Sequence, residues 1–116
     1  MSETSETTEQ VKIVDNPQAS RYEIFDGGQR AGLADYRLPR EGQIAIMHTE
    51  TDPEFGGKGL AGRLTRFLLD DARRRGLAVL PYCPYTRRWI ARHPDYLDLV
   101  PESERPRFQL DGSATE

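Results

Sequence analysis

The chain has 116 residues, a formal net charge of −3 and a single cysteine, Cys83. This length accommodates one small domain with one core, and a lone cysteine excludes an internal disulfide framework and is typical of a reducing compartment. No stretch of the sequence approaches the roughly 20 apolar residues of a membrane-spanning helix, and the negative charge argues against nonspecific nucleic-acid binding. We therefore expect a cytoplasmic protein, a monomer or weak dimer, without a membrane or nucleic-acid partner.

Both ends of the sequence are polar and carry few large apolar residues. Residues 1–10 (MSETSETTEQ) are acidic and lack the basic start and apolar run of a signal peptide, so they predict a disordered leader. Residues 101–116 resemble them in composition and are expected to be largely flexible, with Phe108 and Leu110 as the side chains able to fold back onto the body. The folded domain is predicted to span residues 11–100.

The first half of the chain predicts an antiparallel meander. Residues 11–16 (VKIVDN) are rich in β-branched side chains, and residues 21–38 form a predicted hairpin around the two-residue turn Gly27-Gly28. A further strand is predicted at 43–51 (QIAIMHTET), where apolar residues on both faces of the first half indicate a central position. Simple alternation along this strand places Ile44, Ile46, His48 and Glu50 on one face and Ala45, Met47 and Thr49 on the other.

The second half predicts a helix, a strand and a second helix. Residues 59–75 show an apolar stripe at helical spacing, and Gly76 stands where a left-handed C-cap is expected. The strand at 77–82 (LAVLPY) must then lie parallel to the strand at 43–51, because a strand–helix–strand unit requires a crossover. Pro84 suits the first position of a second helix that ends near His93. The fold class is therefore α+β, with a mixed antiparallel and parallel sheet, one βαβ crossover and a C-terminal helix.

A glycine-rich loop, EFGGKGLAG at residues 54–62, joins the central strand to the long helix. Open α/β sheets tend to bind ligands at the carboxyl ends of parallel strands, and the first N–H groups of a helix are unpaired and attract anions. The loop is therefore either a tight turn or a main-chain cradle for phosphate. It is not a P-loop, because no Ser or Thr follows Lys58, and no second mononucleotide unit supports a dinucleotide fingerprint.

The segment GGKGLA at 56–61 resembles the acetyl-CoA pyrophosphate loop of GNAT-superfamily N-acetyltransferases, Gln/Arg-x-x-Gly-x-Gly/Ala. Gly59 and Ala61 match its last two fixed positions, whereas Gly56 stands at the Gln/Arg position. With the segment CPYTRRWIARHPDY at 83–96, the pattern over residues 11–100 is similar to the minimal YjdJ-like branch of that superfamily, although Thr51 and Gly56 depart from it.

This resemblance implies a shortened GNAT (acyl-CoA N-acyltransferase) fold, in which the strands at 43–51 and 77–82 splay apart. The pantetheine arm of acetyl-CoA, the co-substrate, would lie between them, and the amides of residues 57–62 would hold its pyrophosphate. The implied cofactor-binding residues are Thr49, Thr51, Gly56, Gly57, Lys58, Gly59, Leu60, Ala61, Gly62 and Cys83. No metal is expected.

Acetyl transfer to an amine requires a base for the amine and a proton for the departing thiolate. Cys83 precedes Pro84 as the expected cap of the second helix, where a thiol pKa is lowered. It is therefore an acetyl acceptor, a proton donor or a small core residue. His48 and Glu50 are candidates for the base, and Tyr85 for protonating the sulfur; their alternative roles are a structural histidine, a solvated carboxylate and a packed aromatic ring.

Two functions fit these residues. The first is an acetyl-CoA-dependent N-acetyltransferase acting on a primary amine of a small molecule or a protein. The second is a module that binds CoA or acyl-CoA with little catalysis, which the short chain favours because it lacks the helices that wall the acceptor site in larger GNAT enzymes.

Overall fold

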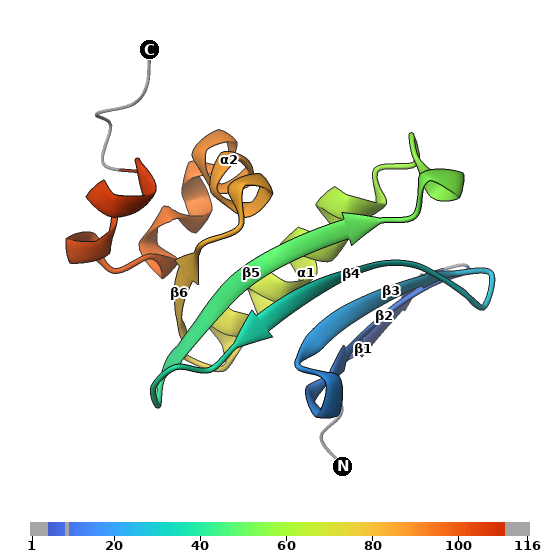
Figure 1. Ribbon diagram of the computed structural model, residues 1–116, viewed down its shortest axis with the longest axis horizontal. Helices are drawn as coiled ribbons and strands as arrows, with labels where there is room; N and C mark the ends of the chain where they lie inside the picture. Colours follow the sequence, from blue (N-terminus) through green and yellow to red (C-terminus); the bar gives the residue numbers. More distant parts are fainter. Residues whose placement is uncertain (1–4, 9, 111–116) are drawn as a thin grey trace.

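The computed structural model describes residues 5–8 and 10–110, which form one mixed sheet with helices on one face and beside one edge (Figure 1). Six strands lie side by side in chain order. Strands β1 to β5 pair antiparallel, and β5 pairs parallel with β6. The strands are β1 (Ser5–Thr8), β2 (Val11–Asn16), β3 (Arg21–Asp26), β4 (Gln29–Arg37), β5 (Gln43–Thr51) and β6 (Ala78–Pro81), and the helices are α1 (Leu60–Arg74) and α2 (Pro84–Arg92). The mixed sheet, the crossover through α1 and the second helix confirm the predicted fold class.

Helix α1 packs its apolar stripe on one face of the sheet. The buried residues on α1 include Leu60, Leu64, Leu68 and Ala72, and Phe67 packs against the same core. They meet buried side chains of the central strands, among them Tyr22, Ile24 and Ile44. The helix ends at a basic turn followed by Gly76, whose φ of 71° is the left-handed conformation expected after a helix.

A bulge in β5 corrects the predicted faces of this strand. Tyr36 of β4 pairs with Ile46, but its neighbour Asp35 pairs with His48, so Met47 is the extra residue. Directly paired residues share a face of the sheet, and an extra residue shifts the alternation of every residue after it. Ile46 therefore faces α1, whereas His48 and Glu50 lie on the opposite face and are exposed. After the bulge, the residues of β5 that face α1 are Thr49 and Thr51.

Both ends of the described chain are more ordered than their composition predicted. Strand β1 pairs with β2 from within the expected leader, an interaction that uses main-chain groups and leaves no apolar signal. Residues 101–110, expected to be largely flexible, follow the body through two 3₁₀ turns, Glu102–Glu104 and Pro106–Phe108. They do so because Phe108 and Leu110 are buried, with the Phe108 ring 5.1 Å from that of Tyr82. The rest of the expected leader and tail, residues 1–4, 9 and 111–116, lies outside the described residues.

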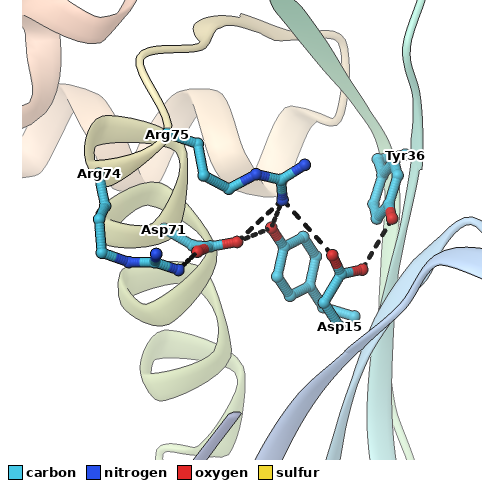
Figure 2. Close-up of polar contacts among 6 residues, drawn as sticks. Asp15, Tyr36, Asp71, Arg74 and Arg75 are labelled. Atoms are coloured by element: carbon cyan, nitrogen blue, oxygen red, sulfur yellow. Dashed lines mark hydrogen bonds and ion pairs between the residues drawn. The ribbon is translucent and has the colours of Figure 1, made fainter. Parts of the chain in front are cut away.

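A buried polar network fastens the C-terminal end of α1 to the sheet (Figure 2). The carboxylate of Asp71 is fully buried and accepts a hydrogen bond of 2.5 Å from the Tyr22 hydroxyl on β3. Arg75 lies 3.1 Å from the same carboxylate, and Arg74 also pairs with it. The neighbouring carboxylate on the helix, Asp70, accepts a hydrogen bond of 2.8 Å from the Tyr96 hydroxyl.

The network continues across the sheet from Arg75 to Asp15 on β2, at 3.4 Å, and from Asp15 to the Tyr36 hydroxyl, at 2.7 Å (Figure 2). Burial, reinforced by the hydrogen bond to Asp71, raises the pKa of Tyr22 far above its ordinary value, and burial with the bond to Asp15 does the same for the pKa of Tyr36. Both hydroxyls therefore remain protonated and able to donate throughout the neutral pH range.

Within the described residues, neither helix is long and apolar enough to cross a membrane.

Candidate active site

The loop between β5 and α1 is shaped by hydrogen bonds of its own. The side chain of Asp52 accepts from the N–H of Glu54 at 3.0 Å and starts a 3₁₀ turn, Pro53–Phe55, which ends when the Gly56 N–H donates to the Pro53 oxygen. The chain then passes through Gly57 at φ 83° and Gly59 at φ 71°. A Cβ at either glycine would point into open space, so the backbone conformation, not packing, requires glycine at these positions.

The first turn of α1 exposes main-chain donors toward this open space. The first hydrogen bond within the helix runs from the Arg63 N–H to the Gly59 oxygen, at 3.2 Å, and the Gly59 N-cap provides no side chain. The N–H groups of Leu60, Ala61 and Gly62 therefore precede the helical ladder and add to the positive end of the helix dipole. Such an arrangement can bind an anion such as a diphosphate.

The side chain of Lys58 is directed away from these donors. Its ammonium group lies 2.9 Å from the buried carboxylate of Asp26 at the end of β3 and 5.4 Å from the centre of the Phe55 ring. The hydrogen bonds from Lys58 and Gln10 lower the pKa of Asp26. The Lys58 side chain thus links the loop to the β3–β4 hairpin through Asp26. Only the main chain of Lys58 is then available to a ligand.

Strand β5 has a free edge beyond its pairing with β6. The parallel pairing covers Gln43–Ile46, and the last contact is the hydrogen bond of 2.8 Å from the Cys83 N–H to the Ile46 oxygen, whereas β5 continues to Thr51. The Asp52 N–H donates to the Ala31 oxygen on β4 at 2.8 Å. Because main-chain groups alternate in direction along a strand, those of Thr49 and Thr51 point away from β4 into the gap that β6 leaves.

Cys83 lies at the closed end of this gap as the N-cap of α2, with 3% of its surface exposed. Its Sγ is 3.5 Å from the Thr49 Oγ1. Burial raises the pKa of the thiol, but the Thr49 hydroxyl and the first turn of α2 at Tyr85 and Thr86 outweigh burial, and the net pKa of Cys83 is lowered. The thiol is therefore more readily ionised than an ordinary cysteine, as a helix N-terminus makes it.

The other two predicted catalytic positions lie apart from Cys83. The His48 Nε2 is 2.9 Å from the Glu50 carboxylate, and both side chains are more than half exposed on the sheet face away from α1. The Tyr85 hydroxyl reaches the first turn of α1, where it would lie 3.8 Å from a Cβ placed on Gly62. Among the described residues, no hydrogen bond joins the His48–Glu50 pair to Cys83 or Tyr85.

Thr86 is the site residue that the sequence analysis missed. It stands on the first turn of α2 next to Cys83 and is completely buried. The signal that points to it is spacing, because an N-cap side chain and the residue three positions later are neighbours at a helix start. Residues 5–8 and 10–110 contain no cluster of His, Cys, Asp and Glu that could hold a metal ion.

Comparisons with known proteins bear on the family and the fold. A family model for GCN5-related N-acetyltransferases matches residues 21–99. The solution structure of a GCN5-like protein from Staphylococcus aureus is similar with a TM-score of 0.55, covering 84% of this chain and 86% of that chain at 20% sequence identity, a likeness that shows the fold. No curated protein matches the chain. The assignment to the YjdJ-like branch stays a prediction.

Proposed function

Because the chain belongs to the GCN5-related N-acetyltransferase family, we propose that it is an acetyl-CoA-dependent N-acetyltransferase that moves an acetyl group to a primary amine of a small molecule or a protein. The observation that carries this proposal is the set of unpaired main-chain N–H groups at the start of α1. These groups lie beside the free edge of β5. The N–H groups at the start of α1 complement a diphosphate. The free edge of β5 complements an extended arm that contains amide groups.

In this proposal the pyrophosphate of acetyl-CoA lies on the N–H groups of residues 57–62, and the pantetheine arm pairs with the main chain of Thr49 and Thr51. The Gly57 and Gly59 conformations support it, since they leave the approach to the amides free of side chains. The thioester then lies near Cys83, at the point where β6 leaves β5.

The acceptor amine approaches from the opposite, exposed face, where His48 and Glu50 lie. A concavity of about 660 Å³ lies next to this pair without being lined by it; its lining includes Asp35, Arg37 and the exposed side chains of Leu38 and Met47. Asp35 is the cross-strand partner of His48, so a protonated amine attracted to Asp35 would lie beside the imidazole. A larger concavity of about 870 Å³ over β2 and β3 is away from α1 and β5 and has no part in this scheme.

Transfer then proceeds directly from thioester to amine. His48, held by Glu50, takes the proton of the ammonium group, and the amine nitrogen attacks the thioester carbonyl carbon. The new C–N bond forms as the C–S bond breaks, and the second proton lost by the nitrogen passes to the CoA thiolate through Tyr85 or water, so that neither relay group is left deprotonated. Holding both reactants in the gap supplies much of the rate. In a second route Cys83 receives the acetyl group first and passes it to the amine.

A panel of primary amines tests this function through the release of free CoA. We expect release above background with at least one amine, and His48→Ala is expected to lower kcat/KM about a hundredfold, the size of a general-base contribution. The matched control is Lys12→Ala, which removes an exposed side chain from the same sheet face.

Tight acetyl-CoA binding with no release from any amine would contradict catalysis and leave the CoA-binding module as the function. Mass spectrometry of the protein after incubation with acetyl-CoA, with Cys83→Ala as control, separates the two routes. Direct transfer predicts no acetylated protein.

A further inference from the structure

The hydroxyl of Thr86 is buried without a hydrogen-bond partner among the described residues. Thr86 has no exposed surface, and its Oγ1 is one of two buried side-chain polar atoms that the described part of the chain leaves unpaired. Buried hydroxyls in folded proteins nearly always have a partner. An unpaired one therefore indicates a group that finds its partner in another state of the protein.

The sulfur of Cys83 is an acceptor at the same turn of the helix as this hydroxyl. Cys83 is the N-cap of α2, and Thr86 is the residue whose N–H an N-cap side chain normally binds. As a thiol, the Cys83 side chain makes no capping hydrogen bond. The N–H and the hydroxyl of Thr86 nevertheless both favour the thiolate form of Cys83. The sulfur also lies 3.5 Å from the Thr49 Oγ1 of β5.

We infer that Thr86 is a positioning residue which, together with Thr49, holds Cys83 as a reactive thiolate. A thiol is a weak acceptor, whereas a thiolate accepts several hydrogen bonds strongly. Loss of the thiol proton to solvent gives the Thr86 hydroxyl the acceptor that it lacks. The hydroxyls of Thr86 on α2 and Thr49 on β5 then both donate hydrogen bonds to the sulfur.

The titratable groups on the neighbouring elements are directed elsewhere. On β5, His48 pairs with Glu50 on the far face of the sheet. On α2, the Arg87 guanidinium donates to the Tyr82 oxygen at 3.3 Å, and the Tyr85 hydroxyl lies beside Gly62 of α1. Against the effect of burial, the pKa of Cys83 is therefore lowered by the hydroxyls of Thr49 and Thr86 and by the main chain at the start of α2.

The inference is tested on the thiol itself, which is unambiguous because Cys83 is the sole cysteine. Thiolate ultraviolet absorbance against pH reads ionisation directly, even for a buried sulfur. Alkylation by iodoacetamide, in which the S–C bond forms and iodide leaves, reads reactivity. Neither measurement needs acetyl-CoA, so the outcome is separate from that of the proposed transfer.

Thr86→Val keeps the shape of the side chain and removes the hydroxyl. We expect its absorbance profile to move to higher pH by about one unit, and alkylation near neutral pH to slow about fivefold to tenfold. Thr86→Ser, which restores a hydroxyl, is expected to titrate as the wild type does. The matched control is Thr65→Val, since Thr65 is equally buried but donates to the Ala61 oxygen of α1, and it is expected to leave the thiol unchanged.

Coincident profiles for the wild type and Thr86→Val would overturn the inference, as would a shift of equal size in Thr65→Val. If Thr86→Val does not fold, Thr86→Ala, which also removes the hydroxyl, decides the question. A profile moved to higher pH then supports the inference, and an unmoved one overturns it.

Discussion

Gly59→Ala is expected to raise the dissociation constant of acetyl-CoA about tenfold, measured by calorimetric titration. Gly59 has a φ of 71° and caps α1, and an alanine in this left-handed region is strained by about 1–2 kcal/mol. Relief of that strain would turn the N–H groups of the first turn away from the position where they converge. The added methyl group would also project into the open space that the diphosphate is proposed to fill.

The control for this substitution lies at the other end of the same helix. Gly76 has the same φ of 71° and likewise no atom near the position of a Cβ. Gly76→Ala should therefore lower the free energy of unfolding about as much as Gly59→Ala does, by about 1–2 kcal/mol, while leaving acetyl-CoA affinity unchanged. Equal affinities for the two variants would show that the loop does not hold the ligand.

Asp71→Ala is expected to lower the free energy of unfolding by about 2–3 kcal/mol, measured by denaturant titration. The loss arises mainly because the fully buried Tyr22 hydroxyl is left without its acceptor. The ion pairs contribute little, since the side chains of Arg74 and Arg75 are 61% and 35% exposed.

The adjacent carboxylate provides the comparison. Asp70 is exposed and accepts from Tyr96, so Asp70→Ala should cost less than about 1 kcal/mol. Tyr22→Phe combined with Asp71→Ala should cost less than the sum of the two single substitutions, because the second removes the group that the first leaves unpaired. An Asp71→Ala variant as stable as Asp70→Ala would contradict the account of Figure 2.

The elements of the fold were largely predictable because they depend on local patterns. The apolar stripe of α1, the Gly27-Gly28 turn and the Pro84 start of α2 are short-range signals that the structure bears out. Strand β1 and residues 101–110 were not predictable in this way. One is held by main-chain pairing and the other by a few apolar side chains in a polar segment.

The arrangement of the candidate site was less accessible to the sequence. The bulge at Met47 is defined by pairing with β4, so nothing within QIAIMHTET indicates that His48 and Ile46 face opposite sides. The pairing of Asp71 with Tyr22 was also not predictable, because the two residues are far apart in the chain and meet only through the way α1 lies across the sheet.

This bulge divides the candidate site between the two faces of the sheet. Thr49 and Cys83 lie on the face covered by α1, and the His48–Glu50 pair lies on the exposed face. The gap beyond the end of β6 is where the two faces meet. In the proposed reaction, acetyl-CoA therefore enters along the α1 edge while the amine arrives from the open face, and no movement of one reactant past the other is needed.

The most direct measurement of the central proposal follows the main-chain amides of the ¹⁵N-labelled protein by NMR during titration with acetyl-CoA. The account predicts that the largest shifts occur at residues 57–62 and at Thr49 and Thr51, with little change at Lys12 on β2. Saturable binding that leaves residues 57–62 unshifted and instead moves amides around Pro106–Phe108, or over β2 and β3, would contradict it.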